Sequence, residues 1–228
     1  DLPGQPSLGQ MIRRLLAHLP ELKRLRISSI DCIEIDDDLK RIIAEEERLM
    51  PHLHLSLQSG DNMILKRMKR RHSRQDAVHL CNELRSLRPD IVFGADLIAG
   101  FPTETDNMFQ KSLALIEDCG LTWLHVFPYS ERSGTPAAKM PPIDKTIRKA
   151  RAASLRDAGA GAARNYLESR IGQIEEVLIE KSNFGRTAHF APIHVTGDIM
   201  PGKIVMARVT GMDKSKTLQA TAIRRDTA

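Results

Sequence analysis

Three turns, each following an apolar and strand-like stretch, carry side chains that can bind a small polar ligand. The turns are Ser28-Ser29-Ile30-Asp31, Gln58-Ser59-Gly60-Asp61 and Ala99-Gly100-Phe101-Pro102-Thr103-Glu104. Their hydroxyl, amide and carboxylate groups can hydrogen bond a ribose or an amino acid, and their glycines let the backbone approach a ligand. Because ligands of parallel α/β folds bind at the carboxyl ends of strands, the turns could form one site. The alternative is that they are ordinary helix-capping turns, with Thr103 or Thr105 as an N-cap.

A run of positive charge follows the second turn. Residues 66–74 contain six lysine and arginine side chains among nine residues. Such a run can hold phosphate groups by charge and counterion release, although charge runs are as often a solvated surface. We take five of these side chains as candidate RNA contacts, namely Lys66, Arg67, Lys69, Arg70 and Arg71.

Residues that could bind a metal are few. His52 and His54 alternate along a predicted strand, so they share a face and could ligate a metal. A structural hydrogen bond is the more frequent role for such histidines. The three cysteines, Cys32, Cys81 and Cys119, match no disulfide, zinc or cluster spacing, which favours free and buried thiols. We therefore predict no metal ligand in this chain.

The elements that must position these residues alternate between helix and strand from residue 7 to about residue 127. Apolar periodicity predicts helices at residues 8–19, from 36, at 73–87 and at 105–119, and strands at 25–30, 52–57, 91–98 and 123–127. The stretch 91–98 is almost continuously apolar, as in strands that are buried on both faces. This alternation predicts a parallel sheet or partial barrel with its helices outside.

After residue 128 the pattern changes. Residues 144–170 are rich in alanine and arginine and predict a long connecting helix. Beyond it, short strands at 175–180, 189–195, 203–210 and 217–222 alternate with glycines, which predicts a small all-β barrel. Its scattered cations, Arg186 among them, and Phe184 suit RNA binding, although a purely stabilising domain could have the same composition. The predicted divisions are therefore 1–143, 144–170 and 171–228.

The whole chain is basic and has no feature of a membrane protein. Its 228 residues carry a formal net charge of +5, with a pI of about 9.2. This balance suits a nucleic-acid partner without requiring one. No apolar run approaches the ~18 residues of a membrane span, and no signal segment opens the chain. We expect a cytoplasmic protein with no membrane partner.

Five segments follow one another in an order that is typical of a known family. They are Ile27-Ser28-Ser29-Ile30-Asp31, His52-Leu53-His54-Leu55-Ser56-Leu57-Gln58-Ser59-Gly60-Asp61, Ile64-Leu65-Lys66-Arg67-Met68-Lys69-Arg70-Arg71, Asp96-Leu97-Ile98-Ala99-Gly100-Phe101-Pro102-Thr103-Glu104-Thr105 and His125-Val126-Phe127-Pro128-Tyr129-Ser130. Together they resemble the radical S-adenosylmethionine (SAM) methylthiotransferase family, and the terminal barrel resembles its tRNA-binding TRAM domain. The second and fourth segments are most similar to members that act on N6-threonylcarbamoyladenosine in tRNA.

The resemblance implies a fold, a reaction and a set of site residues. The fold would be α/β, a partial parallel (β/α) barrel of the radical SAM type followed by a TRAM-like β-barrel. The reaction would form 2-methylthio-N6-threonylcarbamoyladenosine next to the tRNA anticodon, with SAM and 4Fe-4S clusters as cofactors; the resemblance identifies neither the sulfur donor nor a catalytic residue. SAM would lie against Ser29 with Asp31, Gln58 with Ser59, and Gly100, with the backbone of Phe127 and Tyr129 near its adenine.

The chain departs from the family at the iron–sulfur clusters. The family's Cys-x-x-x-Cys-x-x-Cys loop does not occur in the sequence, and none of the three cysteines matches a cluster ligand by spacing. Cluster iron is held by thiolates that other side chains here cannot replace. We therefore expect this chain, truncated at its amino-terminal side, to be inactive by itself and to have an open barrel edge.

Three other functions remain open on the sequence. Two are sibling methylthiotransferases, one acting on isopentenyladenosine in tRNA and one on an aspartate of a ribosomal protein. The third is a non-catalytic RNA-binding protein that has kept the scaffold without the clusters.

Overall fold

The computed structural model describes residues 4–223, and its contacts divide the chain into two units, Asp1–Ala160 and Gly161–Ala228. The predicted domain boundaries, one between residues 143 and 144 and one between residues 170 and 171, remain predictions. Residues 1–3 and 224–228, at the outer limits of the first and last predicted domains, lie outside the described residues.

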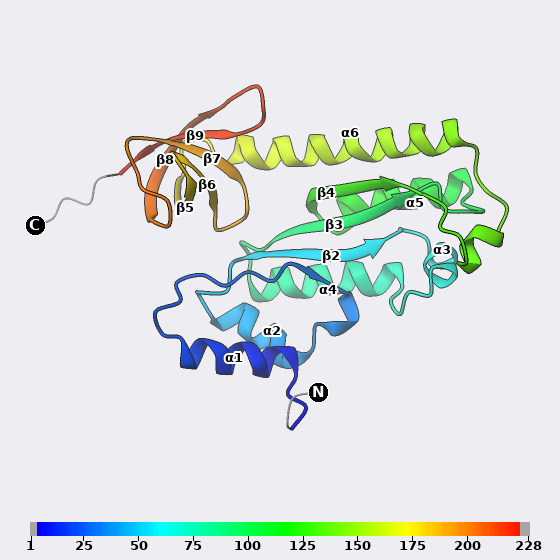
Figure 1. The fold of residues 1–228 in the computed structure, drawn as a ribbon, viewed down its shortest axis with the longest axis horizontal. Helices are drawn as coiled ribbons and strands as arrows, with labels where there is room; N and C mark the ends of the chain where they lie inside the picture. Colours follow the sequence, from blue (N-terminus) through cyan, green and yellow to red (C-terminus); the bar gives the residue numbers. More distant parts are fainter. Residues whose placement is uncertain (1–3, 224–228) are drawn as a thin grey trace, which may run out of the picture. The chain divides into compact units, whose positions relative to one another are not determined.

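The first unit is built on a four-stranded sheet in the order β1-β2-β3-β4, and every neighbouring pair is parallel (Figure 1). Its strands are β1 Ser29–Ile30, β2 His52–Gln58, β3 Val92–Ala99 and β4 Leu121–Pro128. This confirms the predicted parallel α/β arrangement. The first strand is shorter than the predicted 25–30, because Leu25 makes only an isolated bridge to Leu49.

The two faces of this sheet differ sharply in polarity. Along β2 the leucines 53, 55 and 57 are at most 1% exposed and pack toward the helices. The alternate residues of each strand point the other way. We call that side the inner face; in β2 to β4 it carries His54, Ser56, Gln58, Gly94, Asp96, Ile98, Trp123, His125 and Phe127. The prediction that 91–98 is buried on both faces was wrong, since Asp96 and Ile98 are only half-buried.

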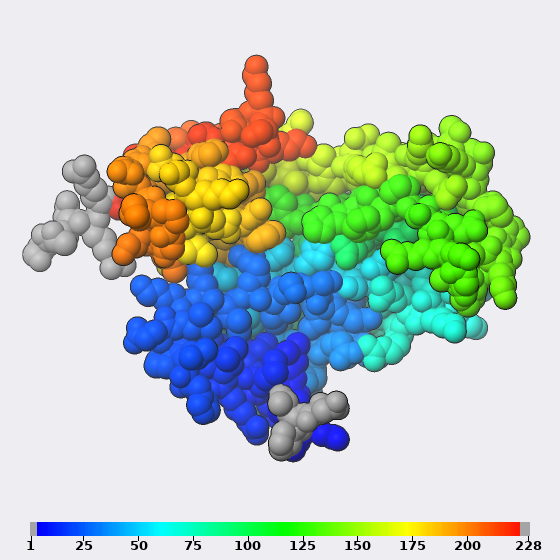
Figure 2. Space-filling view, in the orientation of Figure 1, coloured from blue at the N-terminus to red at the C-terminus, as the bar shows by residue number. Residues whose placement is uncertain are grey.

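Helices cover the apolar face (Figure 1). They are α1 Leu8–His18, η1 Cys32–Glu34, α2 Asp37–Glu45, α3 Asn62–Arg67, α4 Arg74–Leu87 and α5 Asp106–Asp118, with η2 Pro136–Lys139 in the loop after β4. Side-chain caps set where they begin: Ser7 caps α1, Ser73 forms a capping box with Asp76 on α4, and Thr105 rather than Thr103 caps α5. In Figure 2 the blue atoms of the amino-terminal part of this unit form one continuous surface.

The long connecting helix is α6 Lys145–Ser169. Its first half packs on β4, where Gly159 lies against Leu124 and Arg156 donates a hydrogen bond to the Val126 carbonyl at 3.2 Å. No helix among residues 4–223 is both long and apolar enough to cross a membrane.

The second unit is a closed barrel of five strands in the order β5-β6-β7-β9-β8. They are β5 Ile174–Lys181, β6 Phe184–Thr187, β7 Pro192–Thr196, β8 Ile204–Met212 and β9 Leu218–Ala222. This confirms the small all-β barrel, but β6 was missed and the predicted strand 189–195 begins too early. β6 is short and contains Gly185, where a Cβ would lie 2.0 Å from the Leu178 carbonyl oxygen. Glycine is therefore required for the close pairing of β5 and β6, but it also weakens the sequence pattern of a strand.

Candidate functional site

A cavity of about 610 Å³ lies at the carboxyl ends of β2, β3 and β4. Gln58, Ile98 and Phe127, the last inner-face residues of those strands, line it together with Tyr129. Four cations also line it, namely Arg67, Lys69, Arg70 and Arg132. The cavity thus combines aromatic rings with positive charge, a combination that suits an anionic ligand containing a flat ring.

The second turn separates its predicted ligand residues. Gln58 has a positive φ of 65° and lines the cavity. Ser59 is 1% exposed and lies between β2 and α5, where its hydroxyl group shares a 3.4 Å hydrogen bond with Ser112. Gly60 passes so close to α5 that a Cβ would lie 2.3 Å from the Lys111 carbonyl oxygen. Gln58 therefore faces the cavity, whereas Ser59 helps to hold the turn.

Asp61 completes this turn as the N-cap of α3. Its carboxylate accepts hydrogen bonds from the backbone N–H groups of Met63 at 2.9 Å and Ile64 at 3.3 Å, and pairs with Lys111 Nζ at 2.8 Å. Burial acts to raise the pKa of Asp61, but these donors outweigh it and hold that pKa below its usual range. The capping alternative raised for this turn is therefore confirmed for Asp61.

We predict that Asp61→Asn lowers the free energy of unfolding by about 1 kcal/mol at pH 7. A depressed carboxyl pKa contributes stability above the unfolded pKa, about 3.9, and this stability is lost as the pH falls through the folded value. The difference between variant and wild type should therefore close between about pH 5 and pH 2 in urea unfolding. Asp37→Asn, at a side chain that is 92% exposed, is the control and should cost under about 0.5 kcal/mol. A difference for Asp61→Asn that is constant with pH would contradict the role of its charge.

The third turn is held from beneath by a buried ion pair. Gly100 has a φ of 71°, and its N–H group donates to the Glu104 carboxylate at 2.9 Å. Arg151 of α6 donates to that carboxylate at 2.8 Å and to the Glu104 carbonyl oxygen at 2.8 Å. Burial raises the pKa of Glu104, against the opposing effects of Gly100 and Arg151. Gly100 itself does not line the cavity, whereas the next residue, Phe101, does.

Tyr129, directly after β4, is held at the cavity by its backbone and by its ring. The Tyr129 N–H group donates to the Ala99 carbonyl at 2.8 Å, and its carbonyl accepts from Arg148 at 2.8 Å. Its ring lies edge-on to Phe101 at 5.3 Å. The structure therefore brings Phe127 and Tyr129 to the same cavity as Gln58, three of the residues that the resemblance implies for the SAM site.

Ser29 and Asp31 lie apart from each other in their contacts. Ser29 Oγ shares a 2.9 Å hydrogen bond with Ser56 Oγ on the inner face. Asp31 instead accepts from His72 at 3.2 Å and Arg70 at 3.4 Å. Asp31 thus connects the positively charged run to the end of β1. Neither Ser29 nor Asp31 lines the cavity.

The positively charged run is only partly a surface feature. Arg67 hydrogen bonds Thr103, Arg70 pairs with Asp31, and Arg71 pairs with Glu34. Lys66 and Arg71 are not among the residues that line the cavity. In the second unit, Arg186 lies 4.0 Å over the ring of Phe190 and pairs with Glu180 at 3.7 Å, so its guanidinium group is held at a defined place on the barrel.

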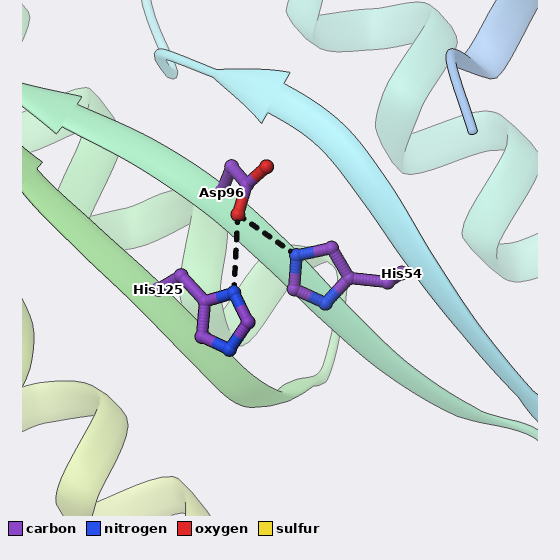
Figure 3. A group of neighbouring side chains, drawn as sticks. All are labelled: His54, Asp96 and His125. Atoms are coloured by element: carbon purple, nitrogen blue, oxygen red, sulfur yellow. Dashed lines mark hydrogen bonds and ion pairs between the residues drawn. The ribbon is translucent and has the colours of Figure 1, made fainter. Parts of the chain in front are cut away.

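A cluster that sequence reasoning missed lies on the inner face. Asp96 Oδ1 is 2.9 Å from His54 Nε2 and 3.3 Å from His125 Nδ1 (Figure 3). The two imidazole rings are 4.7 Å apart between centroids. A Cβ at residue 94 would lie 2.6 Å from His54 Nδ1, so Gly94 provides the space for that ring. The predicted hydrogen-bonded role of His54 is confirmed: its partner is Asp96, and its ring lies against that of His125.

The side chains of His54, Asp96 and His125 also lie close enough together to be considered as ligands of a metal ion. Their ligand atoms lie within 4.8 Å of one another, and among residues 4–223 this is the group of histidine, cysteine and acidic side chains that does so. No local sequence signal could have found it, because only the register of the three strands puts residues 54, 96 and 125 on one face.

The cysteines are free and buried, as predicted. Burial raises the pKa of Cys32 to about 12, and a hydrogen bond with Cys119 together with burial raises that of Cys81. The three thiols lie in the apolar layer under the sheet, and among the residues that the structure describes they do not come together as a ligand group, so they do not fit the thiolate set of an iron–sulfur cluster.

Similar proteins share the sequence of both units. A sequence model of the radical SAM superfamily matches residues 3–116. Threonylcarbamoyladenosine tRNA methylthiotransferase MtaB of Rickettsia prowazekii is 51% identical over 94% of this chain and 51% of its own length. A tRNA-2-methylthio-N(6)-dimethylallyladenosine synthase of Neorickettsia sennetsu is 35% identical over 95% of this chain and 46% of its own length. The chain thus spans about half the length of these curated relatives.

A solved structure has the same arrangement. Coproporphyrinogen III oxidase (HemN) of Escherichia coli, a radical SAM enzyme, matches with a TM-score of 0.52 at 16% identity, over 94% of this chain and 56% of that one. At this identity the likeness shows the fold alone, and it confirms the predicted fold class.

Proposed function

The chain belongs to the radical SAM superfamily, and we propose that it is part of a tRNA methylthiotransferase that acts on N6-threonylcarbamoyladenosine next to the anticodon. The relative named for that nucleoside is 51% identical to it, whereas relatives named for dimethylallyladenosine are 34–37% identical over a similar length. The observation that carries the choice is the polar inner face beneath the cavity. Its histidine, aspartate and serine side chains would be poor neighbours for an apolar dimethylallyl group.

SAM fits the cavity through residues that are present. The cavity volume of about 610 Å³ lies within the usual range for small-molecule sites. Phe127 and Tyr129 can pack against an adenine ring, and the Gln58 amide can hydrogen bond its edge. In this family SAM supplies radical hydrogen abstraction from the target and the methyl group that is transferred. The work of these side chains is to bind and orient SAM and to exclude water from it.

The iron–sulfur clusters do not fit this chain's own cysteines, which are buried and do not come together as a ligand group among the described residues. We therefore propose no cluster ligand here, and no sulfur donor. The cavity cations Arg67, Lys69 and Arg70 are proposed to meet the tRNA backbone by charge, with Arg186 on the barrel as a further contact. Such a substrate is consistent with the predicted cytoplasmic location.

The test is mass spectrometry of nucleosides from total tRNA, in cells with and without the gene that encodes this chain. We expect 2-methylthio-N6-threonylcarbamoyladenosine to disappear from the deletion strain and its unthiolated precursor to accumulate. Restoring the gene should reverse both changes. Loss of the dimethylallyl analogue instead would identify a sibling activity, and no change in either nucleoside would favour an RNA-binding protein without chemistry.

A further inference from the structure

The cluster formed by His54, Asp96 and His125 is not used in the binding of SAM described above. We propose that His125, oriented by Asp96, recognises the polar substituent on the target adenosine and so selects threonylcarbamoyladenosine over dimethylallyladenosine. This inference rests on the proposed function and deepens it by assigning substrate selectivity to one residue.

The contacts of the cluster with Asp96 indicate which imidazole atom faces outward. His54 Nε2 and His125 Nδ1 both point at the same carboxylate oxygen of Asp96, at 2.9 and 3.3 Å. A lone pair facing that oxygen would be repelled by it, so a proton on each of these two nitrogens is the favourable arrangement. The remaining nitrogen of His125, Nε2, is then directed away from Asp96. It accepts a hydrogen bond when the ring is neutral and donates one when the ring is charged.

His125 is also the member of the cluster that a ligand can reach. Its side chain is 64% exposed, whereas those of His54 and Asp96 are 12% and 24% exposed. The His54 ring packs against Gly94 and lies 4.7 Å from the His125 ring between centroids, so it limits the movement of His125. His54 and Asp96 are thus positioning residues, and His125 is the contact.

The cluster lies at the depth that a base substituent would occupy. His125 precedes the cavity residue Phe127 by two positions on the same face of β4, and Asp96 precedes Ile98 in the same way on β3. Two residues of a strand span about 7 Å. A substituent on a base held at the cavity can therefore extend along the inner face to His125.

The two candidate substituents differ in what they offer at that depth. A threonylcarbamoyl group carries N–H and hydroxyl donors and a carboxylate, so it has a partner for either protonation state of His125. Its negative charge also matches the cavity cations Arg67, Arg70 and Arg132. A dimethylallyl group carries only carbon and hydrogen atoms and would strip water from His125 without replacing its hydrogen bonds.

The test measures binding of the 228-residue chain to anticodon stem-loop RNAs by titration calorimetry, in buffer with EDTA. The RNAs carry threonylcarbamoyladenosine, dimethylallyladenosine or unmodified adenosine at the position next to the anticodon. We expect the wild type to bind the first about tenfold more tightly than the second. His125→Phe should reduce that preference to within about twofold while it retains its affinity for the unmodified RNA. Asp96→Asn, which keeps the side-chain shape, should reduce the preference in part.

The matched control is His79→Phe. His79 is an exposed histidine of α4, on the opposite side of the sheet from the inner face, so this substitution should leave the preference for threonylcarbamoyladenosine unchanged. Thermal unfolding of each variant shows whether it is folded. Equal binding of the modified RNAs by the wild type, or an unchanged preference in His125→Phe, would overturn the inference and leave tRNA binding intact. Failure to bind any stem-loop would count against the proposed function as well. A preference that appears only with added Zn²⁺ would overturn direct recognition in favour of a metal at the cluster.

Discussion

Replacing Glu104 with alanine is expected to lower the free energy of unfolding of the first unit by about 3–5 kcal/mol. The Glu104 side chain is fully buried and pairs with Arg151, whose side chain is 8% exposed. Removing the carboxylate leaves the guanidinium group largely buried without its main partner, and it releases the Gly100 N–H group at the same time. Urea unfolding followed by Trp123 fluorescence measures the effect, since this residue is the chain's one tryptophan and lies on β4.

Asp106 provides a matched control for this prediction. It pairs with the same Arg151 side chain at 2.6 Å, but its own side chain is 94% exposed. Asp106→Ala should therefore cost under about 1 kcal/mol. Glu104→Gln, which keeps the volume and one acceptor for Gly100, should fall between the two at about 1–3 kcal/mol. Equal losses for Glu104→Ala and Asp106→Ala would show that burial of the pair isn't what holds the turn.

The Glu104 pair explains why sequence reasoning was only half right about the third turn. A glycine followed by polar residues was taken as a possible ligand site, and the same pattern serves a turn that is anchored from below. The carboxylate that holds the Gly100 backbone depends on Arg151, which lies 47 residues further along the chain. No local pattern contains that information, whereas the helix cap at Thr105 is local and was predicted.

The inner face shows the same limit more clearly. Alternation along residues 52–57 predicted a strand, and the structure confirms it as β2, one residue longer. The grouping of His54 with Asp96 and His125 depends on the register of three strands from separate parts of the chain. Asp96 was taken as part of an apolar run, because a single carboxylate among seven other strand residues barely alters the pattern. Residues selected for what they do on a surface leave little trace in local periodicity.

The isolated 228-residue chain is expected to produce no 5′-deoxyadenosine from SAM above a protein-free control. Radical cleavage of SAM requires an iron–sulfur cluster held by thiolates. The three cysteines, Cys32, Cys81 and Cys119, are each at most 7% exposed, and the pKa of Cys32 is raised to about 12. Iron, sulfide and dithionite should therefore fail to build a cluster on them. Liquid chromatography with mass detection measures the product after anaerobic incubation.

Binding of SAM must be measured separately, because loss of cleavage and loss of binding have different causes. If the cavity at Gln58, Phe127 and Tyr129 is the SAM site, equilibrium dialysis should detect SAM on the chain, and Phe127→Ala should weaken it about tenfold. The substitution removes a ring that is 52% exposed, so it should cost little stability. Coproporphyrinogen III oxidase of Escherichia coli, a radical SAM enzyme, reconstituted in parallel, is the positive control for cleavage. Deoxyadenosine made by the isolated chain would mean that these cysteines, or other side chains, hold a cluster, and the prediction that this chain is inactive by itself would be wrong.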